Sequence, residues 1–265
     1  MTPLPAHELL DRLDAGDRVR LFLDYDGTLA DFAPTPDDVY PDKALAELLR
    51  EIAHQPNVHL SVVSGRRLRH VQRLVPVPGI LLAGTYGIEI ATPEGHLVHR
   101  LELDDVRPAL DAVKPAWSDL LDGRNGFYLE DKEWALAIHA RFAADGEAEL
   151  VIDEARHAAD EIAEQHAPGV FRLLGGHKFL EIGPRMAHKG RTVGYLLSRF
   201  PWPADHLIFV GDDDKDEEAF EVIQEHGGVA VVVAPEERET GADYRLLFPA
   251  DTRRWLAALL ARLRS

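Results

Sequence analysis

Short apolar runs alternate with amphipathic stretches along most of the chain. The runs are rich in Val, Ile and Leu, and they occupy residues 19–27, 58–66, 80–87, 206–213 and 228–234. Continuous apolar runs are typical of strands that are covered on both faces. The intervening and final stretches have helical spacing, and they occupy residues 42–55, 67–75, 192–200, 216–227 and 252–265. This alternation predicts an α/β fold with an open parallel sheet.

The region between residues 105 and 184 has a different pattern. Helical spacing at 106–122 and 148–166 alternates with period-two segments at 126–142 and 170–184. Helices and paired strands in this order indicate a smaller α+β domain inserted into the parallel one. We therefore predict a core domain formed by residues 1–104 and 185–265, and an inserted domain formed by residues 105–184.

Composition and charge narrow the classes of function. The chain has 265 residues, of which 46% are hydrophobic, so it can bury one large core or two modest ones. A formal net charge of −17 argues against general affinity for nucleic acids or anionic membranes. The absence of cysteine excludes disulfides and thiolate chemistry. The acidic, proline-interrupted start is unlike a signal peptide, and no apolar run approaches the ~20 residues of a membrane span, so we expect a soluble, cytoplasmic protein.

Two carboxylates stand at the end of the first run, directly after its apolar residues. Asp24 and Asp26 end the segment LFLDYD (21–26), and a glycine comes next. Ligands of open parallel sheets bind beyond the carboxyl ends of the strands, where these side chains would lie. Carboxylates this close resist joint ionisation unless a cation neutralises them. Since Asp-Gly is also a common turn pair, the two residues by themselves fit either a turn or a metal-binding site.

Two further segments place groups suited to anions at predicted helix starts. Ser64, Gly65 and Arg66 follow the second run, where a hydroxyl, a glycine amide and a guanidinium would form a phosphate site. Ser64 could equally serve as a simple helix N-cap. Lys189 stands just before the helical pattern at 192–200. The helix dipole disfavours a lysine at that end, so we suspect that it faces an anion.

The fourth run leads into an acidic cluster. Six of the seven residues 212–218 are acidic, which exceeds what capping of one helix requires. An EF-hand does not fit, because its sixth position would be Glu217 instead of Gly and its twelfth would be Ile223 instead of Glu. A Mg²⁺ site that uses one or two carboxylates together with a substrate phosphate fits better.

These segments occur in a characteristic order. DYDGT (24–28), SGR (64–66), the lysine of HKG (188–190) and GDDDKDE (211–217) resemble the four motifs of haloacid dehalogenase-like phosphatases. The resemblance spans nearly the whole chain. It implies a Rossmann-like core, and it places the specificity cap in the inserted domain.

The resemblance also implies roles for individual residues. Asp24 would be the nucleophile that forms an aspartyl-phosphate, and Asp26 the general acid and base. The cofactor would be Mg²⁺, held by the Asp24 carboxylate, the Asp26 carbonyl and the Asp212 carboxylate, with Asp213 and Asp216 supporting the waters around it. The phosphoryl oxygens would be held by Ser64, Gly65, Arg66 and Lys189.

The inserted domain carries a second, narrower resemblance. LEDKEWALAIHARF (129–142) and GGHKFLEIGP (175–184) are similar to the cap segments of trehalose-6-phosphate phosphatases. The likeness implies that sugar hydroxyls are bound by Glu130, Lys132 and Glu181, and that Lys178 also belongs to the substrate-binding residues. Arg141 would reach the phosphate, and His139 would lie nearby. Glu130 and Lys132 also fit an exposed pair on one strand face, and this alternative stays open here.

The sequence departs from that family at three positions. Tyr86 stands where a histidine is usual, Lys215 where threonine is preferred, and His188 where a small hydroxyl residue is commoner. We predict a monomeric trehalose-6-phosphate phosphatase that acts on a small sugar phosphate and binds neither nucleic acid nor membrane. A glucosyl- or mannosyl-3-phosphoglycerate phosphatase, or another sugar phosphatase, is the enzymatic alternative. A non-catalytic sugar-phosphate-binding regulator is the alternative from another class, since a fold does not establish activity.

Overall fold

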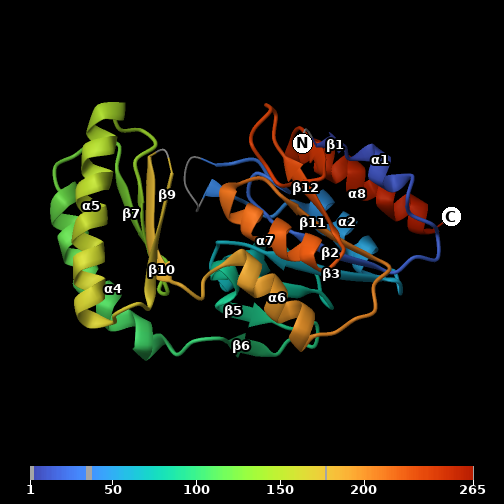
Figure 1. Ribbon diagram of the computed structural model, residues 1–265, viewed down its shortest axis with the longest axis horizontal. Helices are drawn as coiled ribbons and strands as arrows, with labels where there is room; N and C mark the ends of the chain where they lie inside the picture. Colours follow the sequence, from blue (N-terminus) through green and yellow to red (C-terminus); the bar gives the residue numbers. More distant parts are fainter. Residues whose placement is uncertain (1–2, 34–37, 177, 265) are drawn as a thin grey trace. The chain divides into compact units, whose positions relative to one another are not determined.

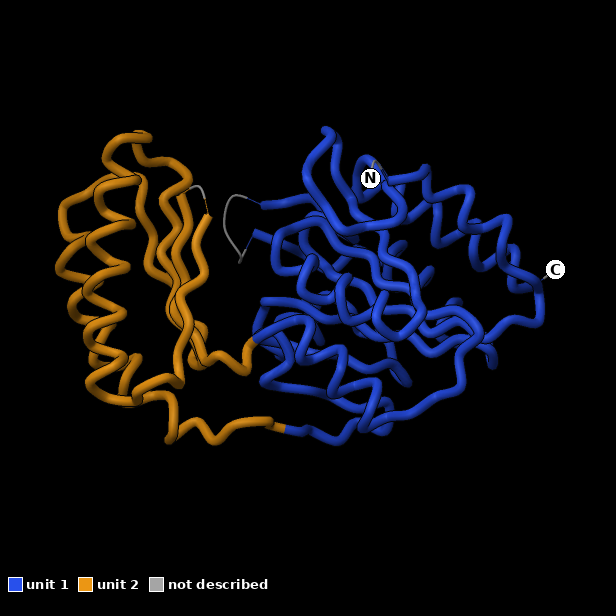
Figure 2. Tube along the Cα trace, viewed as in Figure 1, with its two compact units in different colours: residues 1–98, 188–265 blue, residues 99–187 orange. Residues whose placement is uncertain are grey.

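The computed structural model describes residues 3–33, 38–176 and 178–264, and it divides into two compact units. Unit 1 contains residues 1–98 and 188–265, and unit 2 contains residues 99–187 (Figure 2). The insertion that we predicted at 105–184 falls within unit 2. Each unit has its own sheet and its own helices (Figure 1).

Unit 1 is built on a nine-stranded sheet with the order β1-β13-β12-β11-β2-β3-β4-β5-β6. Its strands are β1 (Leu4–Pro5), β2 (Val19–Leu23), β3 (Val58–Val63), β4 (Leu81–Gly84), β5 (Glu89–Ala91), β6 (Leu97–His99), β11 (His206–Gly211), β12 (Val229–Val233) and β13 (Tyr244–Leu246). The pairs from β1 across to β4 are parallel, and β5 pairs antiparallel with β4. All five predicted strands are present, which confirms the parallel α/β architecture.

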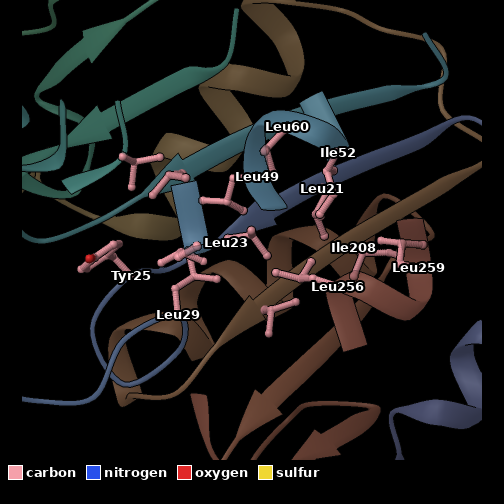
Figure 3. Close-up of a cluster of buried hydrophobic side chains, with 14 of the residues drawn as sticks. Leu21, Leu23, Tyr25, Leu29, Leu49, Ile52, Leu60, Ile208, Leu256 and Leu259 are labelled. Atoms are coloured by element: carbon pink, nitrogen blue, oxygen red, sulfur yellow. The ribbon is translucent and has the colours of Figure 1, made fainter. Parts of the chain in front are cut away.

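Helices bury apolar side chains against both faces of this sheet. One cluster joins β2, β3 and β11 to α1 (His7–Leu10), α2 (Lys43–Ala53), α3 (Leu68–Leu74) and α8 (Pro249–Arg264). Figure 3 shows part of it, with Leu21 of β2 near Ile52 of α2 and Leu256 of α8. The opposite cluster joins the sheet to α6 (Lys189–Arg199) and α7 (Asp214–Glu225). Burial of one such large apolar side chain stabilises the fold by about 1.5–3 kcal/mol.

The helix starts differ from the sequence prediction at the places that matter for function. The amphipathic pattern predicts helices from 192 and 216, but α6 begins at Lys189 and α7 at Asp214. Periodicity locates a helix by its buried face, whereas its first turn is fixed by capping groups. His188 caps α6 through its Nδ1 atom, and Asp213 caps α7 in a reciprocal capping box with Asp216. The caps start α6 three residues and α7 two residues earlier than the periodicity predicts.

Unit 2 packs two long helices on one face of a four-stranded antiparallel sheet (Figure 1). The strand order is β7-β8-β10-β9, with β7 (Tyr128–Asp131), β8 (Leu136–His139), β9 (Phe171–Gly176) and β10 (Phe179–Pro184). The helices are α4 (Leu103–Leu121) and α5 (Asp145–His166), and the Trp117 indole of α4 donates to the Ala155 carbonyl of α5 over 2.8 Å. Within the described ranges, neither unit has a helix with the length and hydropathy of a membrane span.

Candidate active site

Strand register brings the motifs that follow β2, β3 and β11 together at the carboxyl ends of these parallel strands, here called the carboxyl edge of the unit 1 sheet. Leu23 pairs with Val62 of β3 on one side and with Val210 of β11 on the other. The Asp24 amide continues this ladder by donating to the Val210 carbonyl over 2.9 Å. Asp24, Ser64 and Asp212 therefore leave the sheet at the same edge, although they are far apart in sequence.

Lys189 lies buried among the carboxylates at this edge. Its Nζ atom is 2.5 Å from Asp216 Oδ1, 3.1 Å from Asp24 Oδ1 and 3.9 Å from Asp213 Oδ1. The Lys189 side chain is 2% exposed, so these contacts are made away from bulk water. The first residue of α6 thus delivers a cation to the acids that follow β2 and β11.

The acids at this edge outnumber the lysine, and the pKa values of Asp24 and Asp212 are raised. Burial raises the pKa of Asp24 to about 8, with Lys189 opposing and Asp212 reinforcing the shift. Burial and the neighbouring Asp216 and Asp213 raise the pKa of Asp212 to about 7. For Lys189, burial opposes the charged form, but Asp216 and Asp24 outweigh it and hold its pKa well above the usual range.

The same carboxylates fit a divalent cation. Asp24, Asp212 and Asp216 each present an oxygen within 4.8 Å of the other two. Both Asp216 oxygens also make protein contacts: Oδ1 accepts from Lys189, and Oδ2 accepts from the Asp212 amide over 3.0 Å. Buried acids whose pKa values are raised by one another are the donor set that a cation neutralises. These residues therefore suit a metal ion. Because both of its oxygens already make protein contacts, Asp216 is suited to orient the neighbouring groups as well as to serve as a ligand.

Asp26 lies in a different arrangement. Arg66 donates to it through two nitrogens, with Nε 2.6 Å from Oδ2 and Nη2 2.7 Å from Oδ1. This forked ion pair joins the turn after β2 to the turn after β3. The Ser64 hydroxyl accepts from the Arg66 amide over 3.2 Å, so it caps this turn. The structure thus groups Asp26 with Ser64 and Arg66, and Asp24 with Lys189 and Asp212.

Part of the acidic segment at 212–218 serves to cap helix α7. The Asp213 side chain accepts from the Lys215 and Asp216 amides at the start of α7. Burial opposes ionisation of Asp213, but Lys189 and Lys215 outweigh it and lower its pKa. Asp214 is 92% exposed and pairs with Arg238. Only some of the acids predicted from the sequence therefore face the buried cluster.

Unit 2 holds a second polar cluster on the sheet face opposite α4 and α5. Lys132 Nζ is 2.5 Å from Glu181 Oε2 and 4.0 Å from Glu130 Oε2, and His139 Nε2 is 2.9 Å from Glu130. Glu181 pairs with Ala137 and Ala137 with Glu130 across three adjacent strands, so the side chains share one face. The Glu130, Lys132 and Glu181 side chains are only 14%, 11% and 2% exposed. This burial contradicts the alternative of an exposed pair.

Two aromatic rings flank this cluster and were not predicted from the sequence. Tyr128, His139 and Phe179 are aligned in register on three neighbouring strands, with ring centroids 5.9 Å and 5.3 Å apart. The Lys132 ammonium lies 5.9 Å from the Phe179 ring. The period-two pattern at 126–142 puts Tyr128 and Glu130 on the same strand face, so the sequence held a signal for Tyr128. Only the pairing of β10 with β8 shows that Phe179 lies on that face as well.

The other two residues predicted for this domain lie elsewhere in unit 2. Lys178 Nζ donates to the Ala143 carbonyl over 2.7 Å and pairs with Asp145 at 2.6 Å. Arg141 is exposed beyond the end of β8. Thr28, which the sequence prediction did not single out, donates to Asp212 Oδ1 over 3.2 Å. The threonine of the DYDGT segment was the available signal.

Comparisons with known proteins agree with this architecture. A sequence model described as trehalose-phosphatase matches residues 22–250, most of the chain. The chain belongs to the trehalose-phosphatase family. It is 32% identical to a probable trehalose-phosphate phosphatase of Sinorhizobium fredii, over 83% of this chain and 79% of that protein. The trehalose-6-phosphate phosphatase C-terminal domain of Candida albicans has the same fold, with a TM-score of 0.84, 21% identity and 98% coverage of both chains.

A longer relative matches as well. An uncharacterized glycosyl hydrolase of Mycobacterium tuberculosis is 33% identical over 97% of this chain, which spans only 19% of that protein's length. A segment similar to this chain is therefore also part of a much longer polypeptide.

Two of the three departures from the trehalose-phosphatase pattern lie at helix α6: His188 directly precedes Lys189, and Tyr86 contacts Thr192. His188 Nδ1 lies 2.9 Å from Glu218 Oε2, and the Lys189 amide donates to this carboxylate over 3.2 Å. Tyr86 is buried, and its carbonyl contacts α6. Lys215 pairs with Asp213 at 3.0 Å on the outer side of the cluster. These substitutions leave the grouping of Asp24, Asp212 and Lys189 intact.

Proposed function

We propose that this protein hydrolyses a sugar phosphate, with trehalose 6-phosphate as the preferred substrate, and releases trehalose and inorganic phosphate. The observation that carries the proposal is the buried grouping of Asp24, Asp212 and Asp216 around Lys189 at the carboxyl edge of a parallel sheet. Family membership gives the reaction class, and the unit 2 cluster is the reason for choosing a sugar ester.

Asp24 acts as the nucleophile in this proposal. Its carboxylate oxygen forms a bond to phosphorus while the bond between phosphorus and the sugar oxygen breaks. Asp26 gives a proton to the departing oxygen, then takes one from the water that attacks the aspartyl-phosphate and restores Asp24. Arg66 already binds Asp26 through two nitrogens, so it orients this acid and base.

The phosphoryl group is held by Ser64, Gly65, Arg66 and Lys189. Phosphoryl transfer depends mainly on positioning and on stabilising negative charge, which suits a buried lysine and a helix-capping turn. The metal is Mg²⁺, held by the Asp24 carboxylate, the Asp26 carbonyl and the Asp212 carboxylate, with Asp213 and Asp216 supporting its waters. When bound, it offsets the negative charge that the acids and the phosphate share. These oxygen ligands are the kind that Mg²⁺ prefers.

Unit 2 supplies sugar recognition in this proposal. Glu130, Lys132 and Glu181 are paired and buried, and such groups can exchange one another's contacts for sugar hydroxyls at little net cost. The neighbouring Tyr128 and Phe179 rings offer apolar surface against the sugar C–H groups. Lys178 and Arg141 remain predicted contributors, to substrate binding and to the phosphate respectively. Cytoplasmic location and a monomeric state stay predictions from the sequence.

A substrate panel tests the proposal. Phosphate release is measured with Mg²⁺ from trehalose 6-phosphate, glucose 6-phosphate, sucrose 6-phosphate and glucosyl-3-phosphoglycerate, and again with a chelator. We expect the highest kcat/KM for trehalose 6-phosphate and loss of turnover on chelation. Equal rates across the panel would remove the substrate assignment, and a preference for glucosyl-3-phosphoglycerate would select the enzymatic alternative. Tight binding of trehalose 6-phosphate without turnover would select the regulatory alternative.

A further inference from the structure

The turn after β4 has an unusual backbone. Thr85, Tyr86 and Gly87 all lie in the left-handed region, with φ angles of +48°, +51° and +91°. Glycine adopts this conformation freely, but a β-branched residue and an aromatic residue do so only under strain. Strained backbone persists where surrounding contacts hold it, and it gathers at functional sites. The contacts of this turn therefore indicate which parts of the site the strained backbone holds in place.

One side of the turn binds the loop that follows β3 through backbone hydrogen bonds and a ring contact. The Tyr86 amide donates to the Ser64 carbonyl over 2.9 Å, and the Thr85 amide donates to the Arg66 carbonyl over 2.7 Å. A Cβ atom on Gly65 would lie 2.6 Å from the Tyr86 ring, so the ring packs directly on the glycine. All three residues of this loop are thus fixed by the turn.

The other side of the turn contacts helix α6 through Thr192. Thr192 is fully buried, and its hydroxyl donates to the Tyr86 carbonyl over 2.6 Å. A Cβ atom on Gly87 would lie 2.1 Å from the Thr192 hydroxyl oxygen, so the backbone of the turn approaches the helix as closely as glycine permits. Thr192 is three residues after Lys189 and so lies one turn further along the same helix face.

We propose that the Thr85–Gly87 turn is a strained clamp that sets the distance between the Ser64–Arg66 loop and Lys189, with Thr192 and Tyr86 as positioning residues. The inference rests on the proposed function, in which this loop and Lys189 hold the phosphoryl group. Neither positioning residue needs to touch the substrate. Tyr86 is also where the chain departs from the family's usual histidine, so the ring that packs on Gly65 is a feature of this protein's own sequence.

Removal of the Thr192 hydroxyl is the direct test. Thr192→Val keeps the side-chain volume but leaves the buried Tyr86 carbonyl without this donor, so the turn can relax and the loop and lysine can separate. By isothermal titration of inorganic phosphate into the Mg²⁺-supplemented protein, we expect the dissociation constant to rise about tenfold, which is a 1.4 kcal/mol effect. Thr192→Ser keeps the hydroxyl and should restore the dissociation constant to within about threefold of wild type.

A matched control separates positioning from general damage to the core. Thr252 is also fully buried, and its hydroxyl has no hydrogen-bond partner among the described residues. Thr252→Val should therefore leave the phosphate dissociation constant unchanged. Tyr86→Asn is a second, independent variant, because asparagine tolerates the left-handed backbone but lacks the ring that packs on Gly65. It should also raise the dissociation constant several-fold.

The outcomes distinguish this inference from the proposed function. If wild type hydrolyses trehalose 6-phosphate while Thr192→Val and Tyr86→Asn bind phosphate as wild type does, the clamp is wrong and the proposed function stands. If Thr252→Val weakens binding as much as Thr192→Val, or if Thr192→Ser fails to restore it, the clamp is also wrong. If the wild type neither binds phosphate nor turns over any ester, both ideas are overturned.

Discussion

The two units each bury a lysine among acids, but the balance of charge differs. In unit 1, Lys189 contacts three aspartates, and a fourth, Asp212, lies beside them. In unit 2, Lys132 contacts two glutamates, and His139 binds one of them. The first cluster has a clear excess of negative charge, whereas the second is close to balance.

This difference shows what each cluster is suited to bind. Burial, reinforced by the neighbouring aspartates, raises the pKa values of Asp24 and Asp212 to about 8 and about 7. In the proposed function, a cation would neutralise these acids and in turn attract a phosphate. A nearly balanced cluster has no such need, and its donors and acceptors are matched to neutral hydroxyl groups. In the proposed function, charge balance, more than residue type, separates the cluster that binds phosphate from the cluster that binds the sugar.

The nucleophile gives the largest expected effect. Asp24→Asn removes the oxygen that bonds to phosphorus in the proposed reaction, and we expect phosphate release from trehalose 6-phosphate to fall by about 10⁴-fold or more. Steady-state phosphate release at saturating substrate measures it. Asp214→Asn is the matched control from the acidic segment, because this side chain is 92% exposed and lies outside the buried cluster. Turnover by Asp24→Asn within tenfold of wild type would exclude Asp24 as the nucleophile.

Stability tests the charge imbalance itself. Lys189→Met leaves Asp24 and Asp216 buried without their cation, and the free energy of unfolding should fall by about 3–5 kcal/mol. Lys132→Met leaves fewer acids unpaired in unit 2 and should cost less, about 1–3 kcal/mol. Guanidinium denaturation of both variants without added metal measures the difference. Equal losses would show that the two clusters do not differ in charge excess.

Specificity tests the role given to unit 2. Lys132→Met should lower kcat/KM for trehalose 6-phosphate about 10²-fold, because buried Glu181 loses its donor and the sugar hydroxyls of the proposed complex lose theirs. Hydrolysis of 4-nitrophenyl phosphate, which has no sugar, should change little. Lys114→Met is the control, since that lysine pairs with Asp131 on the helix-facing side of the sheet. A parallel loss for both esters would argue that Lys132 serves the fold of unit 2 alone.

The smallest effect concerns how unit 2 is held together. Arg107 and then Lys114, both on α4, lower the pKa of Asp131 on β7 to about 2. Because this folded-state pKa lies below the usual 3.8, the pair stabilises unit 2 above about pH 4, and the contribution is lost as the pH falls toward 2. At neutral pH, Asp131→Asn should lose about 1–2 kcal/mol after allowance for its partial exposure.

Urea denaturation of wild type and Asp131→Asn at pH 7, 4 and 2.5 measures this pair. The difference between the two proteins should be largest at pH 7 and should shrink steadily toward pH 2.5. A difference that stays constant over this range would mean that the Asp131 charge is not responsible for the effect.

Much of unit 1 could be predicted because its signals are local. Apolar runs identified β2, β3, β4, β11 and β12, and a parallel sheet then requires the residues after these runs to share one edge. Asp24, Asp212 and Lys189 lie together there. The exact helix starts were missed, because the caps His188 and Asp213 act over single residues that a 3.6-residue period cannot detect.

The sequence by itself determined which residues are polar at strand ends, and hence the fold class and the family. Only the tertiary structure decided their partners: Asp26 binds Arg66, Lys178 binds Asp145, and Phe179 joins Tyr128 and His139. The strained turn at Thr85–Gly87 and its bond from Thr192 also belong to the tertiary structure. The physical reason is range. Periodicity and capping depend on neighbours in sequence, whereas ion pairs, ring contacts and tolerated strain depend on which segments the packed sheet brings together.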